Sequence, residues 1–200
     1  MTWTVSSIER ERDTITAIDR HDDRSAAILA GAYLEARLTS AIEAHLVADK
    51  KVINKFFAGI GPLATFSAKI DLAYLIDLYP KEITEKLHVI RKIRNYFAHR
   101  LDALMFNSPL IRDLCKRLIH VNSFASFRVT STEELEDTPG LQEMQGIIRQ
   151  FAGVSDTPRS RYMNTIKFLL FFLELKKVSK TMKEHDYLEI IRGKTAMRST

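Results

Sequence analysis

The sequence predicts an all-α protein, a compact bundle of several helices. Apolar residues recur every three or four positions in several long segments, which is the spacing of one face of a helix. Only seven glycines and five prolines interrupt 200 residues, and 46% of the residues are apolar. This composition is typical of a helix-rich domain with its own core. We therefore expect one helical domain over residues 1–185 and a flexible basic tail over residues 186–200.

Capping residues predict the first two helices. Ser6 and Glu9 form a capping box for a helix near residues 6–19. Asp22 or Asp23 can cap a second helix near residues 23–47. Glycine inside a helix costs about 1 kcal/mol relative to alanine, so Gly31 indicates a close helix crossing. The inward stripe of this helix has Glu35 at one step and otherwise consists of Ile28, Gly31, Leu38 and Ile42.

Proline and glycine positions divide the rest of the chain. A loop near residues 59–62 precedes a helix near residues 64–79, and Pro80 opens the main helix, near residues 81–104. Ser108 and Pro109 start a helix near residues 109–121. Residues 122–140 are the least helical, with at most a small irregular or strand-like excursion near residues 122–132. Helices near residues 141–152 and 159–184 complete the bundle.

An arginine interrupts the apolar stripe of the main helix. Ile83, Leu87 and Ile90 are followed by Phe97, and the missing step is Arg94. A guanidinium on a core stripe is costly to desolvate unless it is paired. We expect Arg94 to be largely buried and paired to a carboxylate, and the candidates are, in order, Glu35 and Asp71. Such a pair would either fix the register of the bundle or orient Arg94 toward a ligand phosphate.

A second stripe of the main helix is wholly polar and consists of His88, Arg91, Asn95 and His99. Arginine suits a phosphate, and histidine transfers protons near neutral pH. However, Arg94 and His99 lie roughly 140° apart on a straight helix, so one helix cannot bring both to a small substrate. Either the helix breaks near Ala98, or two copies share a site across a symmetric interface.

The run Ile-Arg-Lys-Ile-Arg-Asn-Tyr-Phe-Ala-His at residues 90–99 resembles the Arg-Asn-x-Phe-Ala-His signature of the mannitol operon repressor-like (MltR) family. Residues 66–74 and 106–118 and the helix near residues 163–180 are similar to other blocks of that family, so the resemblance covers roughly residues 20–180. It implies a dimeric helical regulator that lowers transcription of a sugar operon. No short helix pair followed by a basic recognition helix is visible, so both direct DNA contact and action through a protein partner stay open.

The Arg-x4-His spacing of Arg94 and His99 also resembles the HEPN superfamily, small helical bundles that include metal-independent ribonucleases. This resemblance implies RNA cleavage by the RNA's own 2′-hydroxyl. His99 would move the proton, Arg94 would hold the phosphate and Asn95 would orient one of them. Supporting residues would be Glu35, Asp71 and Arg91. Many HEPN toxins have a tyrosine two residues after the histidine, a position held here by Leu101.

The absence of other motifs excludes several classes of function. No His-x-x-x-His or Cys-x-x-Cys spacing and no phosphate-binding glycine loop occurs, so we expect neither a metal nor a cofactor. The single cysteine, Cys115, excludes an intrachain disulfide and is expected to be buried. With no signal peptide and no apolar run long enough to span a bilayer, the sequence predicts a cytoplasmic protein without a membrane partner. A net charge of +5 permits contact with DNA or RNA without requiring it.

Overall fold

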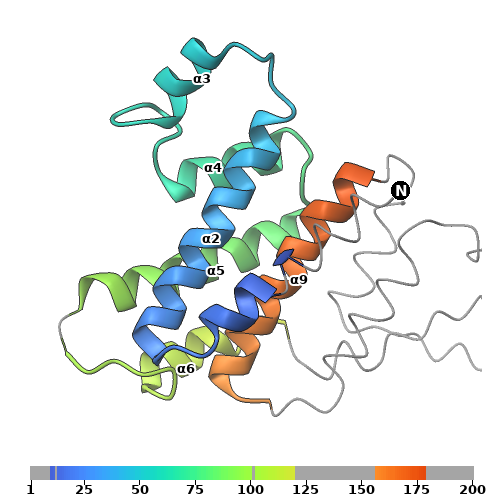
Figure 1. Ribbon diagram of the computed structural model, residues 1–200. Coiled ribbons are helices and arrows are strands. Elements are labelled where there is room, and N and C mark those ends of the chain that lie inside the picture. The colour runs from blue at the N-terminus through green and yellow to red at the C-terminus, as the bar shows by residue number, and fades with distance from the viewer. Residues whose placement is uncertain (1–9, 12, 101, 120–155, 179–200) are drawn as a thin grey trace, which may run out of the picture.

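The computed structural model describes residues 10–11, 13–100, 102–119 and 156–178, and all regular structure in these ranges is helical. The all-α prediction is therefore confirmed. Residues 13–18 form a helical segment before α2. The helices that follow are α2 (Asp23–Glu43), α3 (Lys50–Phe57), α4 (Phe66–Leu75), α5 (Lys81–His99), α6 (Pro109–Cys115) and α9 (Pro158–Val178), as Figure 1 shows.

Helix α2 runs through the middle of the bundle and packs against α4, α5 and α9. Three aromatic side chains join α5, the loop before α6 and α9: the ring of Phe106 lies 5.1 Å from that of Phe97 and 5.3 Å from that of Tyr162, centroid to centroid. All three are fully or almost fully buried. Other members of the same core are Ile15, Leu34, Leu38, Ile70, Ile83, Ile90, Ile166 and Leu169.

The expected cap of α2 is present, whereas Ser108, the expected cap of α6, makes no side-chain capping hydrogen bond. The Asp22 carboxylate accepts hydrogen bonds from the backbone N–H groups of Arg24 and Ser25, both at 3.0 Å, and so caps α2. Asp23 is the first residue of α2, and its carboxylate binds Arg159. Thr65 caps α4, since its hydroxyl oxygen accepts from the backbone N–H of Ala68 at 3.2 Å.

The helix ends differ from the prediction. Helix α5 stops at His99 rather than near residue 104. The Arg24 guanidinium donates to the carbonyl oxygens of Arg100 and Asp102, at 2.5 and 2.9 Å, and this contact holds the backbone beyond His99 away from a helical path. Helix α2 ends at Glu43, α4 spans only Phe66–Leu75, and α6 ends at Cys115. Each is shorter than its periodic pattern, because tertiary contacts rather than periodicity set where a helix stops.

Two further details correct the sequence prediction. The segment between α2 and α4 contains a helix, α3, that was not predicted. On α2, the predicted inward residues Gly31, Leu38 and Ile42 are buried, and Ile28 is only partly buried. Ala27, Ala30 and Leu34 are buried as well, so the inward face is wider than the predicted stripe. The alanines and the glycine on this face let neighbouring helices approach α2 closely.

Several expectations fall outside the described residues, namely the capping box of Ser6 and Glu9, the strand-like excursion near residues 122–132, the helix near residues 141–152 and the tail at residues 186–200. Within the described part of the chain, no helix is long and apolar enough to cross a membrane.

Candidate functional site

Glu35 holds together a charged cluster where α2, α4 and α5 meet. Its Oε1 lies 2.9 Å from Lys69 Nζ, and its Oε2 lies 3.4 Å from Arg94 Nη2. The predicted contact of Arg94 with Glu35 is thus present. Lys69 was not predicted as a member of this cluster, and it lies closer to the Glu35 carboxylate than Arg94 does. Because one carboxylate serves two cations, the cluster retains one positive charge in excess.

Most of the Arg94 side chain is buried, although a part of it stays exposed. Its side chain is 28% exposed, against 16% for Glu35 and 11% for Lys69. Arg94 Nη1 donates to Asn95 Oδ1 at 3.3 Å, whereas its Nε is buried and has no hydrogen-bond partner among the described residues. The guanidinium is therefore held by two neighbours while part of it still reaches the surface.

Gly31 makes room for Arg94 at the crossing of α2 and α5. A Cβ at this position would lie 2.9 Å from Arg94 Cγ and 3.1 Å from the hydroxyl oxygen of Tyr162. That hydroxyl donates to the carbonyl oxygen of Ala27 at 2.8 Å, and burial raises the pKa of Tyr162, so it stays a neutral donor. The close crossing expected from a glycine within the helix is confirmed.

Asp71 does not join this cluster. Its Oδ1 lies 3.1 Å from His88 Nε2, and the two side chains are 61% and 33% exposed. Asp71 was the second candidate partner for Arg94, and the structure places it on His88 instead. Arg91, on the same polar stripe as His88, is half-buried, and its Nε has no hydrogen-bond partner within the described part of the chain.

His99 is the last residue of α5 and is exposed. No contact between His99 and Arg94 occurs in the described residues, so one copy of the chain brings together Arg94, Asn95 and Glu35 but not His99. Chemically, the cluster presents a fixed guanidinium with a net positive surrounding, which suits a negatively charged group. No cluster of metal-ligating side chains is found among the described residues.

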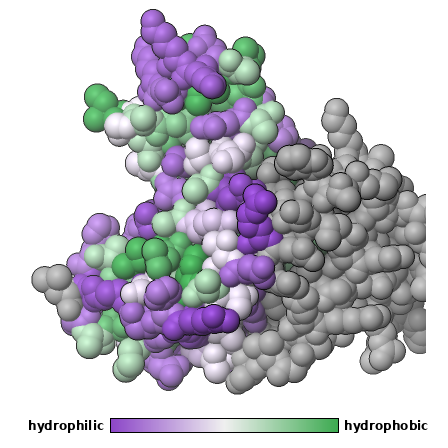
Figure 2. All heavy atoms as spheres, viewed as in Figure 1, coloured by the Kyte–Doolittle hydropathy of each residue, from purple (hydrophilic) through white to green (hydrophobic). Residues whose placement is uncertain are grey.

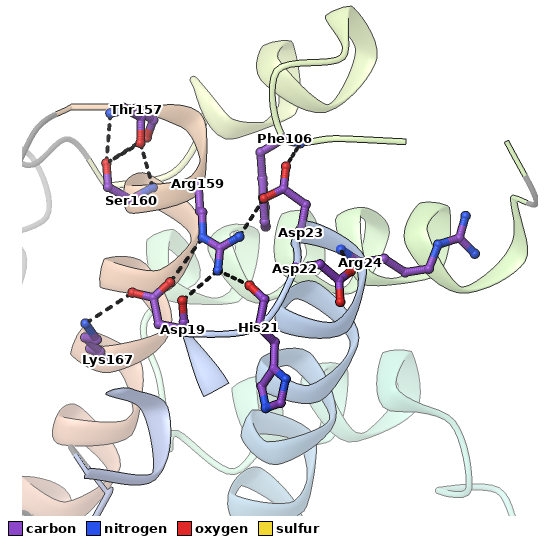
Figure 3. A network of polar contacts seen from close by, with 10 residues as sticks. All are labelled: Asp19, His21, Asp22, Asp23, Arg24, Phe106, Thr157, Arg159, Ser160 and Lys167. Atoms are coloured by element: carbon purple, nitrogen blue, oxygen red, sulfur yellow. Dashed lines mark hydrogen bonds and ion pairs between the residues drawn. The ribbon is translucent and has the colours of Figure 1, made fainter. Parts of the chain in front are cut away.

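A second polar network centres on Arg159 at the start of α9 (Figure 3). Its Nε lies 3.2 Å from Asp19 Oδ1 and its Nη1 lies 2.6 Å from Asp23 Oδ1. Its Nη2 donates to the carbonyl oxygens of Asp19 and His21, both at 2.7 Å. The other carboxylate oxygen of Asp23 accepts from the backbone N–H of Phe106 at 2.8 Å.

This network ties three distant segments together. The guanidinium also lies over the Phe106 ring, 5.9 Å from its centroid. Since four contacts already engage Arg159, we interpret it as a structural clamp rather than a binding site. No local pattern predicts this clamp, because the aspartates that bind Arg159 lie about 140 residues away along the chain.

No family model matches the chain, and no curated protein matches it. Among solved structures, the fold is similar to a chain in the X-ray structure of the MtlR–HPr complex from Escherichia coli, with a TM-score of 0.56 and 18% sequence identity. The match covers 82% of this chain and 98% of that chain. At this identity the likeness shows a shared all-α, MltR-like fold, and it adds no support for a ribonuclease motif at Arg94 and His99.

Proposed function

We propose that this chain is a regulatory protein of the MltR kind, which lowers transcription of a sugar operon of the mannitol type. One observation carries the proposal: the chain's fold matches nearly the whole length, 98%, of a chain in the MtlR–HPr complex. The Arg-Asn-Tyr-Phe-Ala-His run at residues 94–99, which resembles the MltR signature, lies on α5 beside the Glu35 cluster. Similarity of fold and similarity of motif therefore point to the same family of regulators.

We further propose that regulation works through a protein partner and that the protein acts as a homodimer. The neighbouring structure holds MtlR together with HPr, so an HPr-type protein is the first partner to test. Glu35 and the buried Lys69 hold Arg94, which is partly exposed, on a polar face of α5 that extends to His99. Such a face suits a polar partner surface or a second copy of α5 across a two-fold axis.

The proposal is tested by titrating purified HPr of Escherichia coli, the protein bound in the neighbouring structure, into the full chain in a calorimeter. We expect saturable binding with a defined stoichiometry. A parallel gel shift uses the promoter next to the gene, at low and physiological salt. If the protein alone binds this promoter specifically and the binding resists salt, it represses transcription directly rather than through a partner. Absence of both interactions would contradict the regulator proposal.

A metal-independent endoribonuclease is the second candidate. The excess positive charge around Arg94 and the exposure of His99 favour it, since the first suits a phosphate and the second leaves the imidazole free to meet a substrate. Arg94 of one copy and His99 of another would then act together, with Asn95 orienting Arg94.

A further inference from the structure

The segment over residues 44–64, which we call the projection, extends beyond the bundle and carries α3 at its tip (Figure 1). No residue of α3 is buried. The projection is nevertheless ordered by its own contacts. The Asp49 carboxylate caps α3 by accepting from the backbone N–H groups of Lys51 and Val52, at 3.0 and 3.1 Å. The backbone N–H of Leu63 donates to the carbonyl oxygen of Phe56 at 2.9 Å and so closes the loop back onto the helix.

Exposed apolar side chains gather on the projection. Ile60 is 105% exposed and Val47 is 87% exposed, so both stand almost entirely in solvent on the loops that flank α3. Val52 and Phe56, four residues apart on α3, are 48% and 43% exposed and form one row on the helix. Figure 2 shows hydrophobic and strongly hydrophilic residues next to each other in this part of the surface.

Basic residues outnumber acidic residues on the projection, with three lysines and one aspartate. Lys50, Lys51 and Lys55 are exposed, and Lys51 and Lys55 form a row along α3 beside that of Val52 and Phe56. The acidic group on this helix end, Asp49, is engaged in capping. The projection therefore presents positive charge and protruding aliphatic groups together.

We propose that the projection binds an anionic membrane surface. Lysines beside exposed Val, Ile and Phe are typical of helices that lie in the headgroup region, where the cations meet anionic lipids and the apolar groups enter the acyl boundary. A protein interface fits this surface less well, because lysine is depleted in such interfaces and their anchors are mostly Trp, Tyr and Arg. The projection stands out from the bundle, so its tip can reach a membrane surface without contact from the rest of the protein (Figure 1).

This contact needs no membrane-spanning helix, so it is compatible with the absence of a span in the described residues. The proposal departs from the sequence-based expectation that no membrane is a partner, and vesicle binding decides between the two. The inference is independent of the proposed regulatory function, because it rests on the projection and not on the α5 cluster.

The test is sedimentation of the full chain with vesicles of phosphatidylcholine alone or of phosphatidylcholine and phosphatidylglycerol at 70:30. We expect binding to the anionic vesicles only, weakening as salt rises. The triple variant Lys50→Gln, Lys51→Gln and Lys55→Gln should lower the partition coefficient on the order of 100-fold, since each lysine near an anionic surface contributes about fivefold. The pair Val47→Ser and Ile60→Ser should lower it about tenfold by removing inserted methyl groups.

The matched control removes three exposed lysines outside the projection: Lys81→Gln, Lys92→Gln and Lys116→Gln. It has the same net charge as the triple variant and should bind like the parent. Circular dichroism confirms that each variant is folded. No vesicle binding by the parent, or equal losses in the control and the projection variant, would overturn the inference. Loss of HPr binding in the projection variants without any vesicle binding would assign the surface to a protein instead.

Discussion

Arg94 Nη2 lies 3.4 Å from Glu35 Oε2, and the carboxylate of Glu35 is shared with the ammonium group of Lys69. Removing Glu35 would therefore leave the buried Lys69 and the partly exposed Arg94 without the carboxylate that they share. Removing Arg94 would leave Glu35 and Lys69 as a complete pair. The two ends of the same contact are thus not equivalent for stability.

We predict that Glu35→Gln destabilises the fold more than Arg94→Met. Breaking one partner of a fully buried pair costs about 3–5 kcal/mol, and the partial exposure here reduces the expected loss to about 2 kcal/mol. Arg94→Met should cost less than about 1 kcal/mol, because methionine retains much of the packing against Gly31. Urea unfolding midpoints measure both. Asp113→Asn, which breaks the exposed pair with Lys116, is the control and should leave the midpoint unchanged. Equal midpoints for the parent and Glu35→Gln would show that the cluster contributes nothing to stability.

Gly31→Ala is predicted to destabilise the protein although alanine favours a helix by about 1 kcal/mol. The added methyl group would meet Arg94 Cγ at 2.9 Å and the Tyr162 hydroxyl at 3.1 Å, and overpacking of this kind costs about 1–3 kcal/mol. Thermal unfolding measures the net effect. In a Tyr162→Phe background the same substitution should cost less, since one of the two obstacles is gone. A higher melting temperature for Gly31→Ala would mean that the crossing can widen freely.

These residues show what the sequence could predict. The apolar stripe predicted α5, and the break in that stripe predicted the special role of Arg94. Gly31 predicted the close crossing, because a glycine within a helix is likewise a local irregularity in a regular pattern. Lys69 could have been found by the same reasoning, since it lies on the stripe between Phe66 and Ala73. The end of α5 could not, because it depends on Arg24, which is far away in the sequence. The same holds for the Arg159 clamp.

We predict that Arg159→Lys lowers stability by about 2–3 kcal/mol although it keeps the charge. A lysine has one nitrogen and cannot replace a guanidinium that reaches Asp19, Asp23 and two carbonyl oxygens at once. It would leave Asp23 and the backbone carbonyls partly unsatisfied. Urea unfolding measures the loss. Arg112→Lys, at an exposed position on α6, is the matched control and should match the parent. If Arg159→Lys unfolds like the control, the network does not hold the three segments together.

The thiol of Cys115 is predicted to be unreactive in the folded protein. Burial raises its pKa to about 12, so below pH 9 almost none of it is the nucleophilic thiolate. In the unfolded chain a thiol pKa is about 8.5, and the folded state therefore binds more protons between these values. Stability from this group is fully present below about pH 8.5 and is lost as the pH rises toward 12. Labelling with a thiol reagent at pH 8 should follow global unfolding in urea. Rapid labelling without urea would contradict the burial of the thiol.

If the protein is a nuclease, His99 must act together with Arg94 of a second copy. His99 is exposed at the end of α5, and no contact with Arg94 exists within the described part of one copy, so catalysis would require a dimer with the two α5 helices near the axis. Light scattering establishes the oligomeric state first. The parent and His99→Ala are then compared on single-stranded RNA in EDTA, with His45→Ala, an exposed histidine outside α5, as the control. A nuclease of this kind would produce a cyclic phosphate, and its activity would persist in EDTA. The cleavage rate would fall at least about 100-fold in His99→Ala but not in His45→Ala. We expect no cleavage, because the regulator proposal requires none. Cleavage that depends on His99 would favour the nuclease over the regulator proposal. A monomer in solution would exclude a site shared between two copies.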